Sequence, residues 1–249
     1  MKKVILIAVS LVFIAAACNK KSASLVLWDY DMEQNKWGPV GNPPECPPIE
    51  MASPVDLSKA TSILYPGQYR GEDGNYRAHG GFRFDKQTTT QVDVRAPFDA
   101  YVFRGSRYLV NGNLQYVFDF VHPCGIMYRL GHLYKLAPQM QKLADKFPQP
   151  KEGDSRDHLT QNIFFKKGEL LATDVGLPGN VFLDWGVYDV RKQNSQSSSE
   201  AYQQKHEWMA QHAFYAVCLF DYLSQEEQEV VKNLPGGDYK VGKQSDYCE

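Results

Sequence analysis

The chain has 249 residues, of which 43% are hydrophobic and 22% are charged, and its formal net charge at pH 7 is −2. This composition is that of a globular protein with a substantial core. The charge balance shows no basic excess, which argues against nucleic acid as a partner. The 15 tyrosines and 13 phenylalanines favour β-strands over helices through the middle of the chain.

The N-terminus carries an export pattern. Lys2 and Lys3 precede an apolar run over residues 4–17, which is too short to span a bilayer because roughly 20 apolar residues are needed. The run ends in Ala-Ala-Ala followed by Cys18, and this resembles a bacterial lipoprotein signal. The resemblance implies removal of residues 1–17, lipidation of Cys18, and a membrane-anchored envelope protein facing the periplasm or the exterior. The alternative is an ordinary signal peptide, with Cys18 as a spare thiol.

Four further cysteines predict two disulfides, because an even set in an oxidising compartment usually pairs. They are Cys46, Cys124, Cys218 and Cys248. Four cysteines allow three pairings. We favour the local pair Cys218–Cys248, since Cys248 follows the last predicted helix by a short tail, and this leaves Cys46–Cys124. A cysteine-based zinc site is disfavoured because no Cys-x-x-Cys spacing occurs.

The chain pattern predicts strands in the middle and helices at the end. Residues 18–55 are polar and Pro-rich, which indicates a tether or an arm along the domain. Alternating apolar runs then predict strands at 92–96, 100–104, 114–122, 125–130, 162–165 and 181–188. Within 114–122 one face carries Tyr116, Phe118 and Phe120, and the other carries Val117, Asp119 and Val121.

Helical patterns appear in an insertion and after residue 193. The charged segment 137–160 contains a short helical pattern at 139–147, and a polar loop at 193–200 precedes a predicted helix over 201–223. Ser224 and Glu227 form a capping-box pattern that opens a second short helix ending at Pro235. We therefore expect a β domain at 56–192 and a helical extension at 193–249 packed on it.

Five segments resemble, in chain order, the LytM/lysostaphin-type zinc endopeptidase family. They are His-Gly-Gly-Phe-Arg-Phe at 79–84, Val-Arg-Ala-Pro-Phe-Asp-Ala-Tyr-Val at 94–102, the strand-turn-strand at 121–126, Tyr-Arg-Leu-Gly-His-Leu at 128–133, and Lys-Gly-Glu-Leu-Leu-Ala at 167–172. The resemblance implies a mainly β, antiparallel peptidase-like domain of the duplicated-hybrid-motif kind, with a C-terminal helical extension.

The same comparison shows departures at the expected metal site. The family's first zinc ligand matches His79, but its second position holds Arg83, a permanent cation that cannot bind metal. The last ligand position holds Asp184, and Phe182 stands where a catalytic histidine is expected. His132 matches the remaining catalytic position and would be catalytic only in an active enzyme. A catalytic zinc needs three protein ligands and an open position for water.

Other roles for these residues stay open. His79 is either a hydrogen-bonding turn residue or a site residue, and His132 is either a hydrogen-bonded strand residue or a base. Asp85 would replace the lost ligand if the strand shifted, although Arg83 would then lie beside the metal. From the alignment we expect Arg83 and Asp184 to form a salt bridge in place of zinc, since each would be costly alone in the groove.

Two functions follow as hypotheses. The first is a non-catalytic envelope lipoprotein whose groove, with His79, Arg83, Asp85 and Asp184, binds peptidoglycan or scaffolds an envelope protein, without a cofactor. The second is an active zinc metalloendopeptidase that acts on peptidoglycan cross-links, with zinc held by His79 and Asp184. A third class, a carbohydrate-binding module, is supported by the aromatic content, which also serves the core.

Overall fold

The computed structural model describes residues 27–238 and 240–249. The predicted signal at 1–17 and the predicted lipidation site at Cys18 lie outside these residues. The described chain is mainly β, with antiparallel sheets and a C-terminal helical region, which confirms the predicted fold class. The strands are β1 (Leu27–Asp31), β2 (Lys36–Val40), β3 (Ser62–Leu64), β4 (Gln68–Arg70), β5 (Asn75–Arg77), β6 (Gly80–Arg83), β7 (Gln91–Arg95), β8 (Ala100–Val110), β9 (Asn113–Val121), β10 (Ile126–Leu136), β11 (His158–Phe165), β12 (Leu170–Val175) and β13 (Phe182–Asp189).

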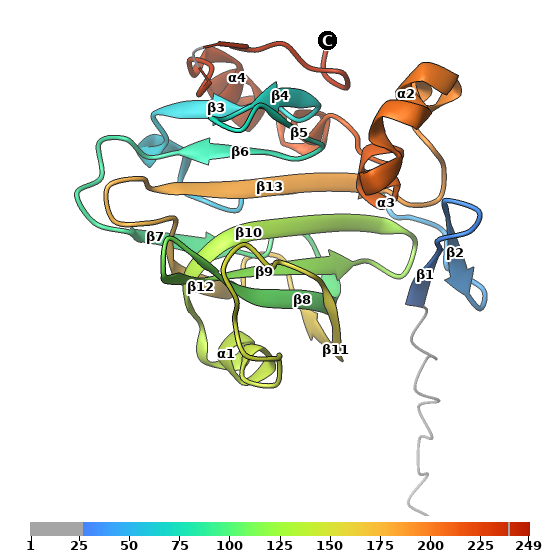
Figure 1. Cartoon of the computed structure of the whole chain (residues 1–249), viewed down its shortest axis with the longest axis horizontal. Coiled ribbons are helices and arrows are strands. Elements are labelled where there is room, and N and C mark those ends of the chain that lie inside the picture. Colours follow the sequence, from blue (N-terminus) through green and yellow to red (C-terminus); the bar gives the residue numbers. More distant parts are fainter. Residues whose placement is uncertain (1–26, 239) are drawn as a thin grey trace, which may run out of the picture.

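A nine-stranded antiparallel sheet forms the centre of the molecule (Figure 1). Its main path runs in the order β11-β8-β9-β10-β13-β6-β3, and β12 joins β10 to β7. The strands predicted at 92–96, 100–104, 114–122, 125–130, 162–165 and 181–188 all fall within β7 to β13. The short strands β3 to β6 have no long alternating run and were not predicted. They nevertheless position half of the candidate site.

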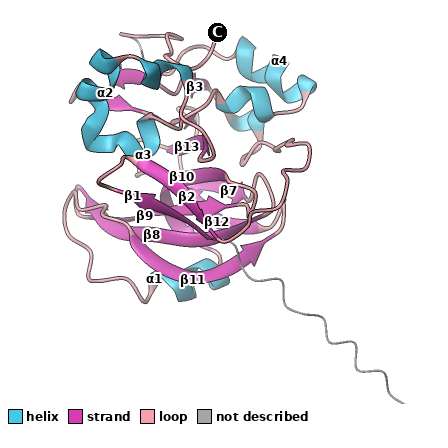
Figure 2. Ribbon diagram, turned by 90° about the vertical axis from the view of Figure 1, so that its right-hand side faces the viewer, coloured by secondary structure: helices cyan, strands magenta, loops and turns pink. Residues whose placement is uncertain are grey.

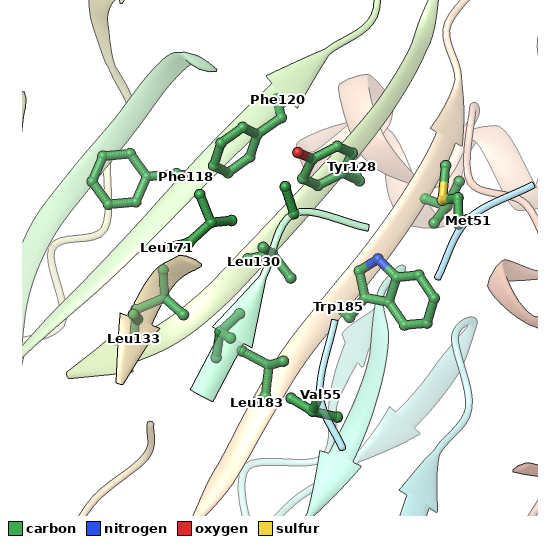
Figure 3. Packing of buried hydrophobic residues seen from close by; sticks show 14 of the residues in the cluster. Met51, Val55, Phe118, Phe120, Tyr128, Leu130, Leu133, Leu171, Leu183 and Trp185 are labelled. Carbon is green, nitrogen blue, oxygen red and sulfur yellow. The ribbon is translucent and has the colours of Figure 1, made fainter. Parts of the chain in front are cut away.

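The side-chain alternation of β9 decides which face of the sheet is buried in the core. Tyr116, Phe118 and Phe120 share one face, as predicted, because successive side chains of a strand point to opposite faces, and the structure places that face in the main core. Leu130 and Leu183 of the neighbouring strands point into the same core, and Figure 3 shows them with Trp185 and Met51. The opposite face of β9 carries Asp119, and it forms the floor of the groove described below.

The N-terminal segment differs from the predicted tether. Residues 27–40 form the hairpin β1–β2, and Trp28 and Trp37 lie in a second core cluster with residues from β10, β13 and α3 (Ala210–Ala213). The indole nitrogen of Trp37 donates to the Gln211 carbonyl at 2.9 Å. Residues 41–61 run along the domain as an arm, and Met51 of this arm is fully buried. Apolar tryptophans thus override the polar composition of the segment.

The helices flank the sheet at two ends. α1 (Pro138–Ala144) lies beside β11, whereas α2 (Glu200–His206), α3 and α4 (Gln225–Asn233) lie at the opposite end (Figure 2). The long helix predicted over 201–223 is broken into α2, α3 and the 3-10 turns Glu207–Met209 and Leu219–Tyr222; two further 3-10 turns occur at Leu57–Lys59 and Ser195–Ser198. None of the helices in the described ranges is long and apolar enough to cross a membrane.

The cap of α4 and both disulfides agree with prediction. The Ser224 hydroxyl accepts the backbone N–H of Glu227, and the Glu227 carboxylate approaches the same hydroxyl at 3.1 Å. Disulfides join Cys46 to Cys124 and Cys218 to Cys248. The first ties the N-terminal arm to the β9–β10 turn, and the second ties the C-terminal tail to the helical region.

Candidate functional site

The polar face of the sheet is hollowed in two adjoining places. The β4–β5 hollow, of about 890 Å³, is lined by Arg70, Arg77, Arg83, Asp85, Phe182 and Asp238 among others. The α3 hollow, of about 960 Å³, is lined by Tyr30, His79, Arg104, Arg129, Tyr188 and Trp208 among others. Arg77, His132 and Asp184 line both. Asp184 therefore lies where the two hollows meet, and we call them together the groove.

The pairing register places Asp184 between two glycines. Asp184 lies opposite Gly81 of β6 on one side and Gly131 of β10 on the other. A Cβ atom on Gly81 would collide with the Leu183 carbonyl oxygen, and one on Gly131 would lie 3.3 Å from the Asp184 Cβ. Paired residues point to the same face of a sheet. Gly81 thus allows β6 to approach β13 closely, and Gly131 leaves room for side chains beside Asp184.

Two histidines fill that room. Nε2 of His79 lies 3.1 Å from Oδ2 of Asp184, and Nε2 of His132 lies 3.4 Å from the same oxygen. His132 adopts φ +58° at the register shift of β10, a left-handed conformation that is uncommon outside glycine. The structure therefore brings three predicted site residues, His79, His132 and Asp184, into one cluster.

Burial sets the charge of this cluster. It lowers the pKa of His79 to about 4, against the opposing effect of the Asp184 carboxylate. Burial acts to raise the pKa of Asp184, but His79 and His132 outweigh it and hold that pKa well below its usual range. At neutral pH His79 is thus neutral, and its Nε2–H donates to an ionised Asp184.

The predicted Arg83–Asp184 salt bridge is wrong. Arg83 Nη2 binds Asp85 Oδ1 at 2.8 Å and Asn180 Oδ1 at 3.2 Å, at the rim of the β4–β5 hollow. The register explains the difference, because Arg83 lies opposite Phe182, which is two residues along β13 from Asp184 on the same face. Asp85 is tied to Arg83 and Thr61 and lies away from the histidine cluster.

The residues present do not fit a catalytic zinc. Zinc ligands bind at about 2.0–2.2 Å and must surround one point. In the described residues 27–238 and 240–249, the ligand atoms of His79, His132 and Asp184 do not all lie within 4.8 Å of one another. The ring of Phe182 packs on His132 with centroids 4.3 Å apart, where the resemblance places a second histidine. The Asp184 oxygen is instead held by direct contacts to the two histidines.

A second charge cluster, which the sequence did not predict, lies in the floor of the α3 hollow. Asp119 is paired in register with Arg104 of β8 and Arg129 of β10, and its carboxylate contacts Arg104 Nε at 2.5 Å and Arg129 Nη1 at 2.8 Å. Asp157 contacts Arg129 at 3.3 Å, and His212 lies 3.8 Å from Asp119. The sequence signal was a charged residue between Phe118 and Phe120 on a strand that is otherwise apolar.

The arginines decide what this cluster can bind. Burial acts to raise the pKa of Asp119, but Arg129 and Arg104 together hold it well below its usual range. Asp119, Asp157 and His212 place their ligand atoms within 4.8 Å of one another, a spacing that suits a metal ion. Two permanent cations already neutralise both carboxylates, so a metal ion would meet repulsion there. The cluster is a closed ion-pair network.

No family model and no curated protein matches the chain. A solved structure of Helicobacter pylori Csd3 from an orthorhombic crystal is similar with a TM-score of 0.38 and 14% identity, over 74% of this chain and 40% of that chain. The chain thus spans less than half of the length of Csd3.

Proposed function

We propose that the protein is a non-catalytic cell-wall-binding protein built on a LytM/lysostaphin-type peptidase-like domain. Five sequence segments that resemble this family occur in its order. His79 and His132, from two of these segments, meet in the groove with Asp184, which stands at the family's last ligand position. A resemblance of sequence segments alone does not fix function. The proposal therefore depends on what the groove residues can do.

The state of Asp184 is the observation that carries the proposal. Its carboxylate accepts a hydrogen bond from His79 and lies 3.4 Å from His132. Arg83 cannot bind a metal and forms an ion pair with Asp85. Hydrolysis of a peptide needs an activated water. Of the family's three ligand positions, two hold His79 and Asp184, and the third holds the cation Arg83, which lies outside this cluster. A long groove without that centre is suited to holding a wall polymer.

The groove offers contacts for such a polymer. Trp208 is 68% exposed and Met32 is 82% exposed, and both line the α3 hollow. Exposed aromatic faces bind sugar rings and apolar side chains. Neighbouring Arg156 and Asp154 supply polar groups at the same wall.

The location forms part of the proposal. Anchoring through a lipidated Cys18 would hold the groove at the membrane surface in the cell envelope, within reach of peptidoglycan. The two disulfides are consistent with an oxidising, exported environment.

The test combines three measurements on the purified protein. We expect sedimentation with isolated peptidoglycan sacculi, no release of soluble fragments from them, and a zinc content well below one per chain after dialysis against zinc. Trp208→Ser should weaken the sedimentation several-fold, whereas Leu159→Ser should not. Leu159 is the matched control because it is 84% exposed on the edge strand β11. Stoichiometric zinc with release of wall fragments would support the metallopeptidase instead.

A further inference from the structure

Arg70, in β4, is a buried cation that faces the β4–β5 hollow. Only 6% of the residue is exposed. Its Nη1 atom donates to the backbone carbonyls of Tyr65 and His79, both at 2.9 Å. These two bonds use both hydrogens of Nη1, so the N–H of Nε and the two of Nη2 remain.

The other buried arginines of the groove have acidic partners. Arg104 and Arg129 share Asp119, and both also approach Asp157. By contrast, no carboxylate among residues 27–238 and 240–249 lies within 4.0 Å of a nitrogen of Arg70. A buried charge without a partner is costly unless something supplies the opposite charge.

Four of the five acids that line the β4–β5 hollow are engaged elsewhere, and among the described residues the fifth, Glu72, forms no ion pair with Arg70. Asp73 binds Arg77 at 2.6 Å, and Asp85 binds Arg83 at 2.8 Å. Asp238 accepts the backbone N–H groups of Gly71, Lys240 and Val241. Asp184 is held by the two histidines. Among the described residues Arg70 therefore has no carboxylate in direct contact, although the charges of Asp184 and Asp238 act on it from a distance.

The unused donors of Arg70 are accessible from the hollow. In the described part of the chain, no nitrogen of Arg70 is both fully buried and without a hydrogen-bond partner. Nε and Nη2 therefore reach the solvent-filled space. Burial lowers the pKa of Arg70 to about 10, so the guanidinium is still charged at neutral pH. Parallel N–H groups on one edge of a guanidinium match the two oxygens of a carboxylate.

We propose that Arg70 forms a carboxylate-binding subsite in the β4–β5 hollow, where Nε and Nη2 hold the two oxygens of an acidic group of the ligand. This inference rests on the proposed function, in which the ligand is wall peptidoglycan and the acidic group belongs to its peptide. A hollow of about 890 Å³ has room for a peptide segment around that group. Asp184 lies at the boundary of the same hollow, so the peptide would end beside the histidine cluster.

The experiment compares charged and neutralised forms of one ligand. Soluble muropeptides released from sacculi are titrated into the protein before and after amidation of their carboxylates, and binding is followed by calorimetry. We expect the untreated muropeptide to bind at least tenfold more tightly. Arg70→Lys, which keeps a charge but loses the paired donors, and Arg70→Met should remove most of this preference. Arg95→Met, which removes an exposed arginine paired with Asp93 outside the groove, should retain it.

A direct readout does not depend on how the variants fold. The side-chain Nε–H signal of Arg70 in the wild-type protein, followed by nuclear magnetic resonance, should shift on addition of muropeptide and not of its amidated form. Sodium acetate serves as a probe of the subsite without the wall. A shift with acetate and none with muropeptide would retain the subsite and overturn wall peptide as its ligand.

The outcomes separate this inference from the proposed function. Binding to sacculi with equal affinity for both muropeptide forms would overturn the carboxylate subsite and leave the wall-binding function intact. Absence of binding to sacculi and muropeptides would overturn the function. The subsite would then stand only if acetate shifts the Arg70 signal, and an unchanged signal would overturn it as well.

Discussion

His79 and Asp184 are joined by a contact of 3.1 Å between Nε2 and Oδ2, at the point where the two hollows of the groove meet. The register of β6 against β13 sets Gly81, two residues after His79, opposite Asp184, and the lack of a Cβ on Gly81 lets the two strands approach closely. The main chain of His79 is fixed as well, since its carbonyl accepts from the buried Arg70. The cluster is therefore held from both its side chains and its backbone.

Replacing Asp184 by Asn should destabilise the protein. The amide can accept from one histidine, but it presents an N–H group to the other, and it removes the negative charge that both approach. We expect a loss of about 1–3 kcal/mol in the free energy of unfolding, measured by urea denaturation at pH 7. Asp85→Asn is the control, since the Asp85 side chain is 49% exposed, and it should lose less than about 0.5 kcal/mol.

Stability should fall as the pH is lowered from about 6.5 towards 4. The pKa of His79 is about 4 in the folded protein against a reference value of 6.5. Between these values the unfolded chain binds a proton at this residue and the folded chain does not, so acid favours unfolding. One such proton changes the free energy of unfolding by at most about 1.4 kcal/mol per pH unit.

His79→Gln should therefore make the pH profile of stability shallower between pH 6.5 and 4. Burial also lowers the pKa values of His206 and His212, so part of the slope remains in the variant. Urea unfolding at pH 4.5, 5.5 and 7 measures the slope. The exposed His158 provides the control, and a profile of His79→Gln as steep as that of His158→Gln would contradict the assignment.

The fold was predictable wherever the strands are long and alternate. The alternation of Phe118 and Phe120 with Asp119 separated the two faces of β9, but it did not decide which face packs in the main core. The hairpin β1–β2 was not predicted, because its two tryptophans lie in a polar, Pro-rich context and their burial depends on distant contacts such as Trp37 with Gln211. The helix over 201–223 had mixed spacing, and the structure resolves it into short pieces.

The sequence predicted which residues lie in the site, but it did not predict which ion pairs they form. His79, His132 and Asp184 were expected at one place from the resemblance. The partner of Arg83 depends on the register of β6 against β13, which the sequence does not reveal, and a shift of two residues would be needed to bring Arg83 opposite Asp184. The sequence did not predict a binding role for Arg70. Its lack of a direct acidic contact depends on which residues the acids of other segments bind.

Removing the disulfides should destabilise the protein unequally. Cys46–Cys124 closes a sequence separation of 78 residues and Cys218–Cys248 one of 30. Closing a longer loop restricts the unfolded chain more, and a native disulfide typically contributes about 2–4 kcal/mol. The double substitution of Cys46 and Cys124 by Ser should therefore lower the urea midpoint more than that of Cys218 and Cys248. The reverse order would show that native packing, rather than loop length, dominates.

Cys18→Ser should release the protein from membranes. The prediction rests on the Ala-Ala-Ala-Cys sequence after an apolar run of export-signal length. The wild-type chain should partition into detergent after export, and the variant should not. Unchanged membrane fractionation of the variant would contradict lipidation at Cys18. Cys46→Ser serves as the control for loss of a cysteine elsewhere.

Asp119→Ala should be among the most destabilising single changes in the groove. The Asp119 side chain is fully buried and neutralises Arg104 and Arg129, whose side chains are 11% and 16% exposed. Its removal leaves two guanidiniums with Asp157 as the remaining acid, and breaking a buried pair typically costs about 3–5 kcal/mol. The matched control is Asp93→Ala, which removes an aspartate that is 53% exposed and bound to Arg95 at 3.3 Å; it should cost less than about 0.5 kcal/mol. Urea denaturation of both variants at pH 7 measures the difference. Equal losses for the two would mean that water enters the α3 hollow and solvates the arginines once the carboxylate is gone.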